Sequence, residues 1–288
     1  MRHVVSRRKT DERSLPPALL EVAGLVVEFG GVRALDGVAV KADPGSIVGI
    51  IGPNGSGKTT LLNVISGFVK PASGSVRVDG EEIVDYLPEE RIDVGVVRSF
   101  QDCLLFPDLS VEDSLLLTED AKHSTGVTST TLQMPWARRS ERRKREAVDR
   151  VITIFGLDRF RHHSTSHLST GTRRVVDLAS IALADPRLLL LDEPTAGIAQ
   201  REAEAFVPLI QRLHEAANTT ILIIEHDVPL VFGLCSKVVV METGKVVASG
   251  TPSEVKRDPR ALRAYLGASE EALAVSGPAS DASTCEPG

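Results

Sequence analysis

IVGIIGPNGSGKTT, residues 47–60, joins an uninterrupted apolar run to a glycine-rich loop. The apolar run 47–51 does not alternate with polar residues, which predicts a central strand buried on both faces of a sheet. The loop that follows matches G-x-x-x-x-G-K-[ST], and a helix is predicted over 59–67, ending at Gly67. A buried strand, this loop and a helix in that order predict an α/β fold.

The loop itself predicts a phosphate-binding site. Its glycines allow backbone N–H groups to point at an anion, and the helix start adds its positive dipole end. Lys58 is expected to reach the β- and γ-phosphates of a nucleoside triphosphate, and the Thr59 hydroxyl to ligate Mg²⁺. The flanking strand and helix argue against an incidental glycine-rich turn. The residues predicted to bind the nucleotide here are Gly52, Pro53, Asn54, Gly55, Ser56, Gly57, Lys58, Thr59 and Thr60.

A second apolar run, residues 188–191, ends in the acidic pair Asp192-Glu193. The run predicts a buried strand whose acids emerge at its carboxyl edge, where open α/β sheets bind ligands. Asp192 suits Mg²⁺ held through water, and Glu193 suits a general base or polariser of an attacking water. The structural alternative is a helix N-cap that follows a strand.

The organisation along the chain supports a mostly parallel sheet interrupted by a helical insertion. Residues 111–185 contain no convincing strand. Within them, LSTGT at 168–172 precedes an apolar-periodic helix. Ser169 and Gly171 stand where that helix begins, so they either bind an anion or simply form a good helix start. The strands predicted by apolar runs are 25–29, 45–51, 75–78, 187–191, 220–224, 237–241 and 245–249.

Composition excludes several classes of protein. With 288 residues, 42% hydrophobic and 25% charged, the chain is a globular protein of one large or two small domains. A net charge of −6 argues against a nucleic-acid-coating protein. The basic run 138–150 is interpreted as a solvated helix face, because no aromatic residues interleave with its charges. Three widely spaced cysteines without CxxC fit a reducing cytoplasm.

The two ends of the chain differ from its middle. Residues 1–16 are predicted to be a disordered basic extension, and residues 268–288 a disordered acidic tail. The folded part is then 17–267. No uncharged apolar run reaches the roughly 18 residues that a bilayer span needs. Residues 1–15 are charged without an apolar segment behind them, which does not match a signal peptide.

Taken together, five motifs resemble the ATP-binding cassette (ABC) family in order and spacing. They are residues 52–60, Ser99-Phe100-Gln101, 168–172, 188–193 and Glu225-His226-Asp227. The resemblance spans about residues 20–267. It implies a P-loop NTPase cassette: a RecA-like, mostly parallel sheet with an antiparallel β edge and an inserted helical subdomain at about 102–185, inside an ATPase domain over 17–267.

The resemblance also implies roles for single residues around the nucleotide. Phe29 aligns with the aromatic that stacks on adenine, although it could be plain core. Gln101 resembles the glutamine that contacts Mg²⁺ and links the nucleotide to the helical subdomain. Glu193 matches the catalytic glutamate. His226 matches the histidine near the γ-phosphate, with a satisfied structural histidine as the alternative.

The signature segment carries an intersubunit expectation. Ser169 and Gly171 resemble the residues that bind the γ-phosphate of ATP held by the opposite subunit of a head-to-tail dimer. Two positions depart from the family pattern: Thr172 stands where Gln is usual, and Ala199 where many members have Asp. Neither change removes a phosphate ligand, so hydrolysis is still expected, while its rate and cooperativity are open.

A finer resemblance indicates one branch. FGGVRAL at 29–35, LFPDLSV at 105–111 and the ending GTPSEV at 250–255 resemble ATP-binding subunits of branched-chain amino acid importers. This resemblance implies that the protein binds ATP and Mg²⁺ and forms a homodimer or a heterodimer with a related ATPase. It implies two transmembrane permease partners that contact residues 104–111, an indirect link to a solute-binding protein, and no nucleic acid partner. It also implies a location on the cytoplasmic face of the cell membrane. The expected solute is a branched-chain amino acid or a related small polar solute. The alternatives are an exporter ATPase, a nucleotide-sensing subunit, and an ABC ATPase that acts on nucleic acid or ribosomes.

Overall fold

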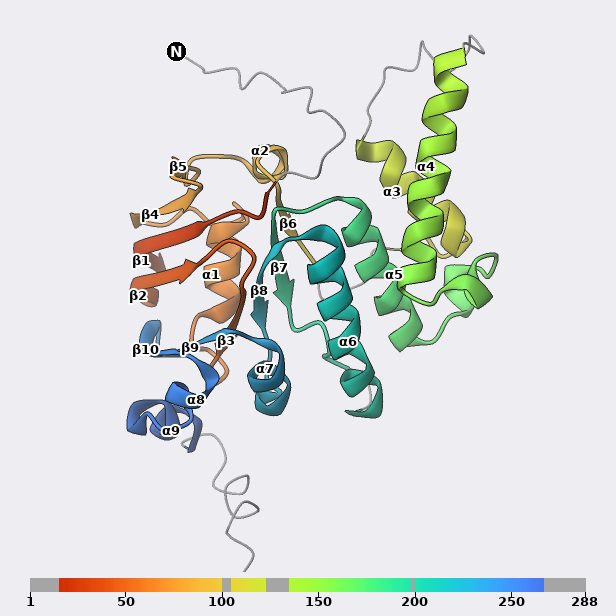
Figure 1. Ribbon diagram of the computed structural model, residues 1–288. Helices are drawn as coiled ribbons and strands as arrows, with labels where there is room; N and C mark the ends of the chain where they lie inside the picture. Colours follow the sequence, from red (N-terminus) through yellow and green to blue (C-terminus); the bar gives the residue numbers. More distant parts are fainter. Residues whose placement is uncertain (1–15, 100–104, 123–134, 198–199, 267–288) are drawn as a thin grey trace, which may run out of the picture.

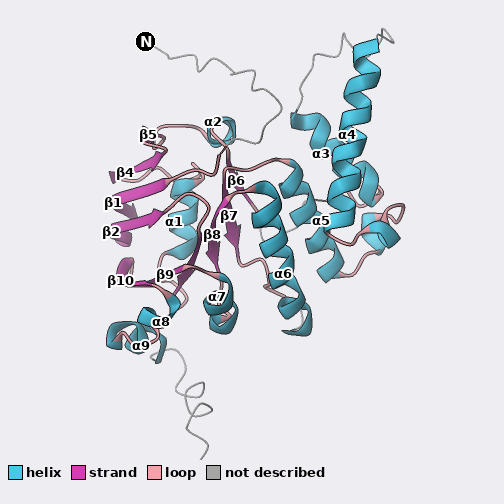
Figure 2. Ribbon diagram, in the orientation of Figure 1, coloured by secondary structure: helices cyan, strands magenta, loops and turns pink. Residues whose placement is uncertain are grey.

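The computed structural model describes residues 16–99, 105–122, 135–197 and 200–266. At its centre lies a six-stranded sheet in the order β10-β9-β3-β8-β7-β6 (Figures 1 and 2). The strands β9, β3, β8, β7 and β6 run parallel, and β10 pairs antiparallel with β9. The predicted α/β fold with a mostly parallel sheet and an antiparallel edge is therefore confirmed. The strand bounds are β3 Ile47–Ile51, β6 Val96–Arg98, β7 Leu188–Asp192, β8 Thr220–Ile224, β9 Lys237–Glu242 and β10 Lys245–Gly250.

Every residue of β3, β7 and β8 is buried, because the sheet has a hydrophobic core on each face. Side chains alternate along a strand, so Leu189 and Leu191 enter one core while Leu188 and Leu190 enter the other. The first core contains α5 (Thr170–Leu183), α6 (Gln200–Ala217) and α7 (Val228–Leu234), and the second contains α1 (Lys58–Ile65). This double burial explains why these strands are apolar without alternation.

A smaller antiparallel sheet, β2-β1-β4-β5, completes the second core. Strand β1 begins five residues before the predicted start at Leu25, and β2 was not predicted at all. The sequence of β2 hides its period, because Asp36 and Gly37 interrupt it and its pairing with β1 shifts register several times. The bounds are β1 Leu20–Phe29, β2 Val32–Ala42, β4 Ser73–Val78 and β5 Glu81–Glu82.

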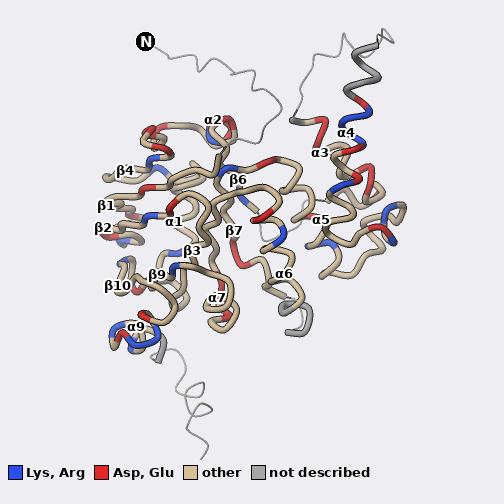
Figure 3. Tube along the Cα trace, viewed as in Figure 1, with Lys and Arg blue, Asp and Glu red and all other residues tan. Residues whose placement is uncertain are grey.

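Between β6 and β7 the chain forms helices that stand to one side of the sheet (Figure 1). They are α3 (Val111–Lys122), α4 (Pro135–Ile154) and α5. Two short 3-10 turns, Asp158–Phe160 and Thr165–His167, lie between α4 and α5. In the described part of 105–185, the strand-like pairing is a single bridge between Ser110 and Ser164. Basic and acidic residues follow one another along the part of α4 that is coloured in Figure 3, and most of residues 141–147 are exposed, as expected of a solvated face.

Smaller corrections concern element ends. The strand predicted at 45–51 starts at Ile47, because Gly45 has φ +68° in the preceding turn. The helix predicted at 59–67 is α1 and ends at Ile65, followed by Ser66 as its C-cap. The remaining helices are α2 (Pro88–Asp93), α8 (Pro252–Val255) and α9 (Pro259–Leu266). No helix within the described ranges combines the length and apolarity that a membrane span requires.

Candidate functional site

The glycine-rich loop lies between β3 and α1, and its walls come from distant parts of the chain. A Cβ on Gly52 would sit 2.1 Å from the Met241 carbonyl oxygen of β9, and one on Gly57 would sit 2.5 Å from the Ala34 carbonyl oxygen of β2. The Gly244 N–H also donates to the Ser56 carbonyl oxygen at 3.1 Å. Glycine at 52 and 57 is therefore a steric requirement, since backbone atoms occupy the space of a side chain.

Lys58 lies inside this loop and is only 5% exposed. Its Nζ donates to the carbonyl oxygens of Gly52 at 2.8 Å and Pro53 at 2.9 Å. Burial lowers the pKa of Lys58, and the negative charges of Glu193 and Asp192 oppose that effect. The ammonium group thus sits within the electrostatic reach of both acids. Asn54, Gly55 and Thr59 are exposed on the rim of the loop, and Thr60 is half-buried.

Asp192 ends β7 and is 3% exposed. Its Oδ2 accepts from Arg98 Nη2 at 2.7 Å, and Arg98 Nη1 donates to Asn63 Oδ1 at 2.6 Å on α1. Two buried oxygens, Asp192 Oδ1 and Ser56 Oγ, make no hydrogen bond with any described residue. A buried carboxylate oxygen without a partner is costly, and it is what an Mg²⁺ with its coordinated water would satisfy. The donor set here therefore fits the predicted metal.

Glu193 follows Asp192 in a left-handed backbone conformation, with φ +49°. Such a φ is uncommon for a residue with a side chain and is held here by neighbouring contacts. Its N–H donates to the Ile224 carbonyl oxygen at 3.0 Å. The Glu193 Oε1 atom lies 2.7 Å from His226 Nε2, and the His226 side chain is 47% exposed. The structure thus places Glu193 and His226 together at the carboxyl edge of β7 and β8.

Two further residues shape the turn after Glu193, and the sequence patterns assigned neither a role. The Glu225 carboxylate is 3% exposed and accepts from both the N–H and the hydroxyl of Thr195, at 2.9 and 2.7 Å. Arg174 on α5 donates to backbone carbonyls of the same turn. Glu225 stands inside a motif and Arg174 two residues after one, but only the folded chain reveals their partners. Arg98 was missed for the same reason.

The signature segment lies at the start of α5. Ser169 is the N-cap: its Oγ accepts from the Thr172 N–H at 3.2 Å and lies 3.0 Å from the Thr172 hydroxyl. Thr172, which replaces the usual Gln, is therefore part of this cap. No hydrogen bond between the described residues joins Ser169 or Gly171 to residues 52–60. Within one chain, these two groups of predicted residues are not brought into contact.

Three predicted residues remain. Phe29 ends β1 and is 52% exposed, so the plain-core alternative is wrong for this residue. An exposed aromatic remains available to stack on a base. Gln101 and Ala199 lie outside the described residues.

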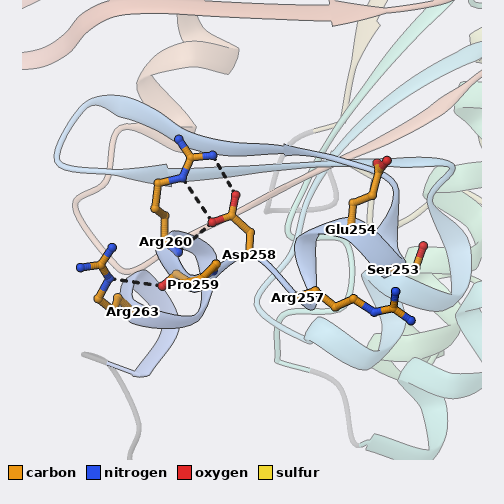
Figure 4. Close-up of a pocket in the computed structure, with 7 residues that line it drawn as sticks. All are labelled: Ser253, Glu254, Arg257, Asp258, Pro259, Arg260 and Arg263. Carbon is orange, nitrogen blue, oxygen red and sulfur yellow. Dashed lines mark hydrogen bonds and ion pairs between the residues drawn. The ribbon is translucent and has the colours of Figure 1, made fainter.

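A separate open hollow lies at the α8–α9 end of the chain (Figure 4). Arg260 and Asp258 form an ion pair in its wall, and this pairing together with backbone donors lowers the pKa of Asp258 to about 2. None of the predicted nucleotide ligands lines this hollow. Its lining residues are Ser253, Glu254, Arg257, Asp258, Pro259, Arg260 and Arg263.

Comparison with known proteins gives two family matches. A family described as ABC transporter matches residues 35–196. A second, described as branched-chain amino acid ATP-binding cassette transporter, matches residues 245–271. The second match contains the residues around the hollow of Figure 4.

Individual proteins agree with these matches. The high-affinity branched-chain amino acid transport ATP-binding protein BraF of Pseudomonas aeruginosa is 38% identical over 250 residues, covering 86% of this chain and 98% of BraF. LivG of Escherichia coli, which carries the same description, is 38% identical over 253 residues, with 86% and 98% coverage. A solved ATP-binding cassette of an ABC transporter in its ADP conformation is similar with a TM-score of 0.74 and 29% identity, covering 87% of this chain and 99% of that one.

Proposed function

The chain belongs to the ABC transporter family, and from this membership we propose that it is the ATP-hydrolysing subunit of an importer for branched-chain amino acids. The family membership establishes an ATP-binding cassette with ATPase activity. The match over residues 245–271 and the similarity to BraF and LivG support the solute class. They favour import over the exporter, sensor and nucleic-acid alternatives.

The observation that carries the catalytic proposal is the Glu193–His226 contact at 2.7 Å, beside the lysine of the phosphate loop. In this arrangement the Glu193 carboxylate accepts a proton from, or orients, the water that attacks the γ-phosphate. His226 holds the Glu193 carboxylate in place and lies on the side of the site where the γ-phosphate binds. Lys58 exchanges its bonds to the Gly52 and Pro53 carbonyls for bonds to the phosphates. Phe29 provides the exposed ring on which adenine stacks.

We assign Mg²⁺ to the same edge of the sheet. Thr59 and Asp192 would hold it, and Gln101 completes the set that the family resemblance implies. Bound there, the ion would neutralise charge on the β- and γ-phosphates. The unpartnered Asp192 Oδ1 supports this assignment. Arg98 fixes the other carboxylate oxygen, so the free oxygen keeps one orientation.

The separation of the signature from the phosphate loop supports a head-to-tail dimer. Ser169, which is exposed, and Gly171, which is half-buried, lie at the start of α5, where N–H groups and a hydroxyl can receive a γ-phosphate from a second subunit. Two ATP molecules are then each held between one loop and the opposite signature. The second subunit is either a copy of this chain or a related ATPase.

The remaining partners follow from the importer assignment. Two permeases provide the membrane path, a solute-binding protein delivers the amino acid, and this chain sits on the cytoplasmic face of the membrane. We place the permease contact at the segment before α3, where Phe106 is 58% exposed. Exposed aromatic side chains of this kind are frequent anchors of protein interfaces.

Glu193→Gln tests the hydrolytic proposal directly. The variant should bind Mg-ATP, lose hydrolysis by about 100- to 10,000-fold, and accumulate as an ATP-dependent dimer in size-exclusion chromatography. Glu215→Gln, an exposed change on α6, is the matched control and should hydrolyse ATP like the parent chain. A Glu193→Gln chain that stays monomeric at saturating Mg-ATP contradicts the dimer, and one that keeps the parental rate contradicts the role of Glu193.

The solute class has its own experiment. Cells in which this gene is deleted should lose uptake of radiolabelled leucine, and the parent gene should restore it while Lys58→Ala should not. Leucine uptake that is unaffected by the deletion, while another solute is lost, contradicts the solute class but leaves the ATPase assignment in place.

A further inference from the structure

The helix that begins with the signature reaches the catalytic turn through one side chain. Arg174 lies in the first turns of α5 and points to the turn after β7, 19 to 22 residues further along the chain. Its Nη1 donates to the Pro194 carbonyl oxygen at 2.7 Å and, at a longer 3.4 Å, to that of Glu193. Its Nη2 donates to the Ala196 carbonyl oxygen at 2.5 Å. One guanidinium group therefore gathers three backbone carbonyls of a single turn.

The same turn is fixed from its other side by the sheet. Glu193 N–H is bound to Ile224, and Thr195 is bound to the buried Glu225 carboxylate. Arg174 supplies the opposite anchor, from the helical part of the molecule. A guanidinium group suits this task because its N–H donors have a fixed planar geometry, whereas a lysine ammonium is a point charge on a flexible stem.

These contacts hold Glu193 in its unfavourable backbone conformation. At φ +49°, a residue with a side chain relaxes toward negative φ when the surrounding bonds are removed. Such a rotation would move the carboxylate away from His226 Nε2, which now lies 2.7 Å from it. The position of Arg174 is therefore mechanically linked to the position of the catalytic carboxylate.

Arg174 is also linked to the signature. Ser169 caps the helix and Arg174 follows about one turn later, so a shift of the helix start carries Arg174 with it. We propose that Arg174 is a positioning residue that couples the two ATP sites of the dimer. When the signature of one subunit engages the ATP held by its partner, Arg174 sets the turn that presents Glu193 to the subunit's own ATP. This inference rests on the head-to-tail dimer proposed above.

The departure at Ala199 gives this contact added weight. The family resemblance leads one to expect an acidic residue at that position, and this chain has alanine instead. The Arg174 contact runs inside one subunit and does not need that acid. It provides a route from signature to catalytic turn that this sequence retains.

The neighbouring arginine provides a matched control. Arg173 lies on the same helix turn and also donates to two backbone carbonyls, of Thr165 at 3.0 Å and Ser166 at 2.7 Å. Those acceptors belong to the segment just before the signature, so Arg173 ties α5 to its own subdomain. Removing Arg173 loses hydrogen bonds to two backbone carbonyls and removing Arg174 loses hydrogen bonds to three, but only Arg174 connects to the turn of Glu193.

The experiment compares the full-length parent chain with Arg174→Met, Arg174→Lys and Arg173→Met. ATP hydrolysis is measured against ATP concentration, and hydrogen exchange is followed at residues 193–197. Arg174→Met should lower kcat on the order of 100-fold with little change in KM, bring the Hill coefficient from above 1 to 1, and speed exchange in the turn. Arg173→Met should keep the Hill coefficient of the parent and leave exchange at 193–197 unchanged.

Arg174→Lys keeps the positive charge, and it tests the proposal even if the Arg174→Met chain does not fold. It should fold, bind Mg-ATP and still lose most of the cooperativity, because an ammonium cannot span the three carbonyls. A folded Arg174→Lys chain with the parental Hill coefficient and exchange pattern would overturn the coupling. So would a parent chain that dimerises with ATP yet hydrolyses it without cooperativity. Failure of the parent chain to dimerise with ATP at all would instead overturn the proposed dimer.

Discussion

Asp192 and Arg98 form an ion pair in which the two side chains are 3% and 9% exposed. Removal of one partner of such a pair leaves a charge without compensation in a poorly solvated place, which costs about 3–5 kcal/mol. Arg98→Met should therefore lower the free energy of unfolding by about that amount in urea titrations. Arg142→Met breaks the Arg142–Glu146 pair, whose side chains are 81% and 49% exposed, and should cost less than about 1 kcal/mol. Equal costs for the two variants would show that Arg98 does not compensate Asp192.

Asp177, on the signature helix, predicts a pH dependence. Burial raises the pKa of Asp177 from its ordinary 3.8 to about 6, and the nearby Arg174 charge opposes this only partly. The folded chain therefore binds more protons than the unfolded chain between about pH 4 and 6. The contribution of Asp177 to the free energy of unfolding is thus largest below pH 4 and is lost as the pH rises through 6.

Asp177→Asn should remove this dependence. At pH 7.5 the variant should be more stable than the parent by up to about 3 kcal/mol, since each pKa unit corresponds to about 1.4 kcal/mol. At pH 4 the two chains should unfold at nearly the same urea concentration. A variant whose stability difference is the same at both pH values would contradict a raised pKa for Asp177.

At the residue scale, the sequence predicts groups that act within a motif but not those whose partners are remote. Lys58, Asp192 and Glu193 follow from loop and strand patterns a few residues long. Arg98 meets its carboxylate partner 94 residues later, and Glu225 meets Thr195 across 30 residues. Only the order of strands in the sheet brings β6 beside β7 and β7 beside β8, and no local pattern contains that order.

The phosphate loop and the β9–β10 hairpin form one unit at the scale of secondary-structure elements. Gly52→Ala would place a Cβ 2.1 Å from a carbonyl oxygen of β9, which cannot move without breaking the sheet, and also strains a φ of +154°. We expect Gly52→Ala to lower the free energy of unfolding by about 3 kcal/mol or more. We also expect Mg-ATP no longer to stabilise the variant against thermal unfolding.

Gly55→Ala is the matched change, because nothing lies within 4 Å of the added Cβ at φ +78°. Gly55→Ala should lower the free energy of unfolding only by the backbone strain, about 1–2 kcal/mol. If both alanine variants lower the free energy of unfolding equally, the close approach of β9 is not what requires glycine at position 52.

The predictability of elements follows from how they are buried. Strands β3, β7 and β8 are buried on both faces, so their continuous apolar runs identify them. Strand β6 has three residues, too few for any period, and β2 is broken by Asp36 and Gly37. The strands predicted at 237–241 and 245–249 are joined by the two-residue turn Thr243-Gly244, with φ +45° and +74°, a conformation typical of tight hairpins.

At the scale of the whole molecule, we predict that residues 16–266 suffice for ATP binding and dimerisation. The first described residues are anchored: Ala18 N–H donates to the Arg187 carbonyl oxygen, and Arg187 Nε donates to that of Pro16. A chain limited to 16–266 should unfold within about 1 kcal/mol of the full chain and bind Mg-ATP equally. A chain starting at 25 should be destabilised by several kcal/mol, because it lacks the buried Leu20 and Val22. Loss of ATP binding in the 16–266 chain would assign a role to the excluded ends.

The hairpin that closes the phosphate loop has a consequence for synthesis on the ribosome. Strand β3 ends at residue 51, yet its two neighbours, β8 and β9, and the turn that binds Ser56 come from residues 220–244. A nascent chain therefore exposes an apolar strand and an unformed loop until most of its length has been translated. Because contacts so distant in sequence form slowly, we expect ATP to assist only the last stage of maturation, and the exposed strand to be prone to aggregation before that stage.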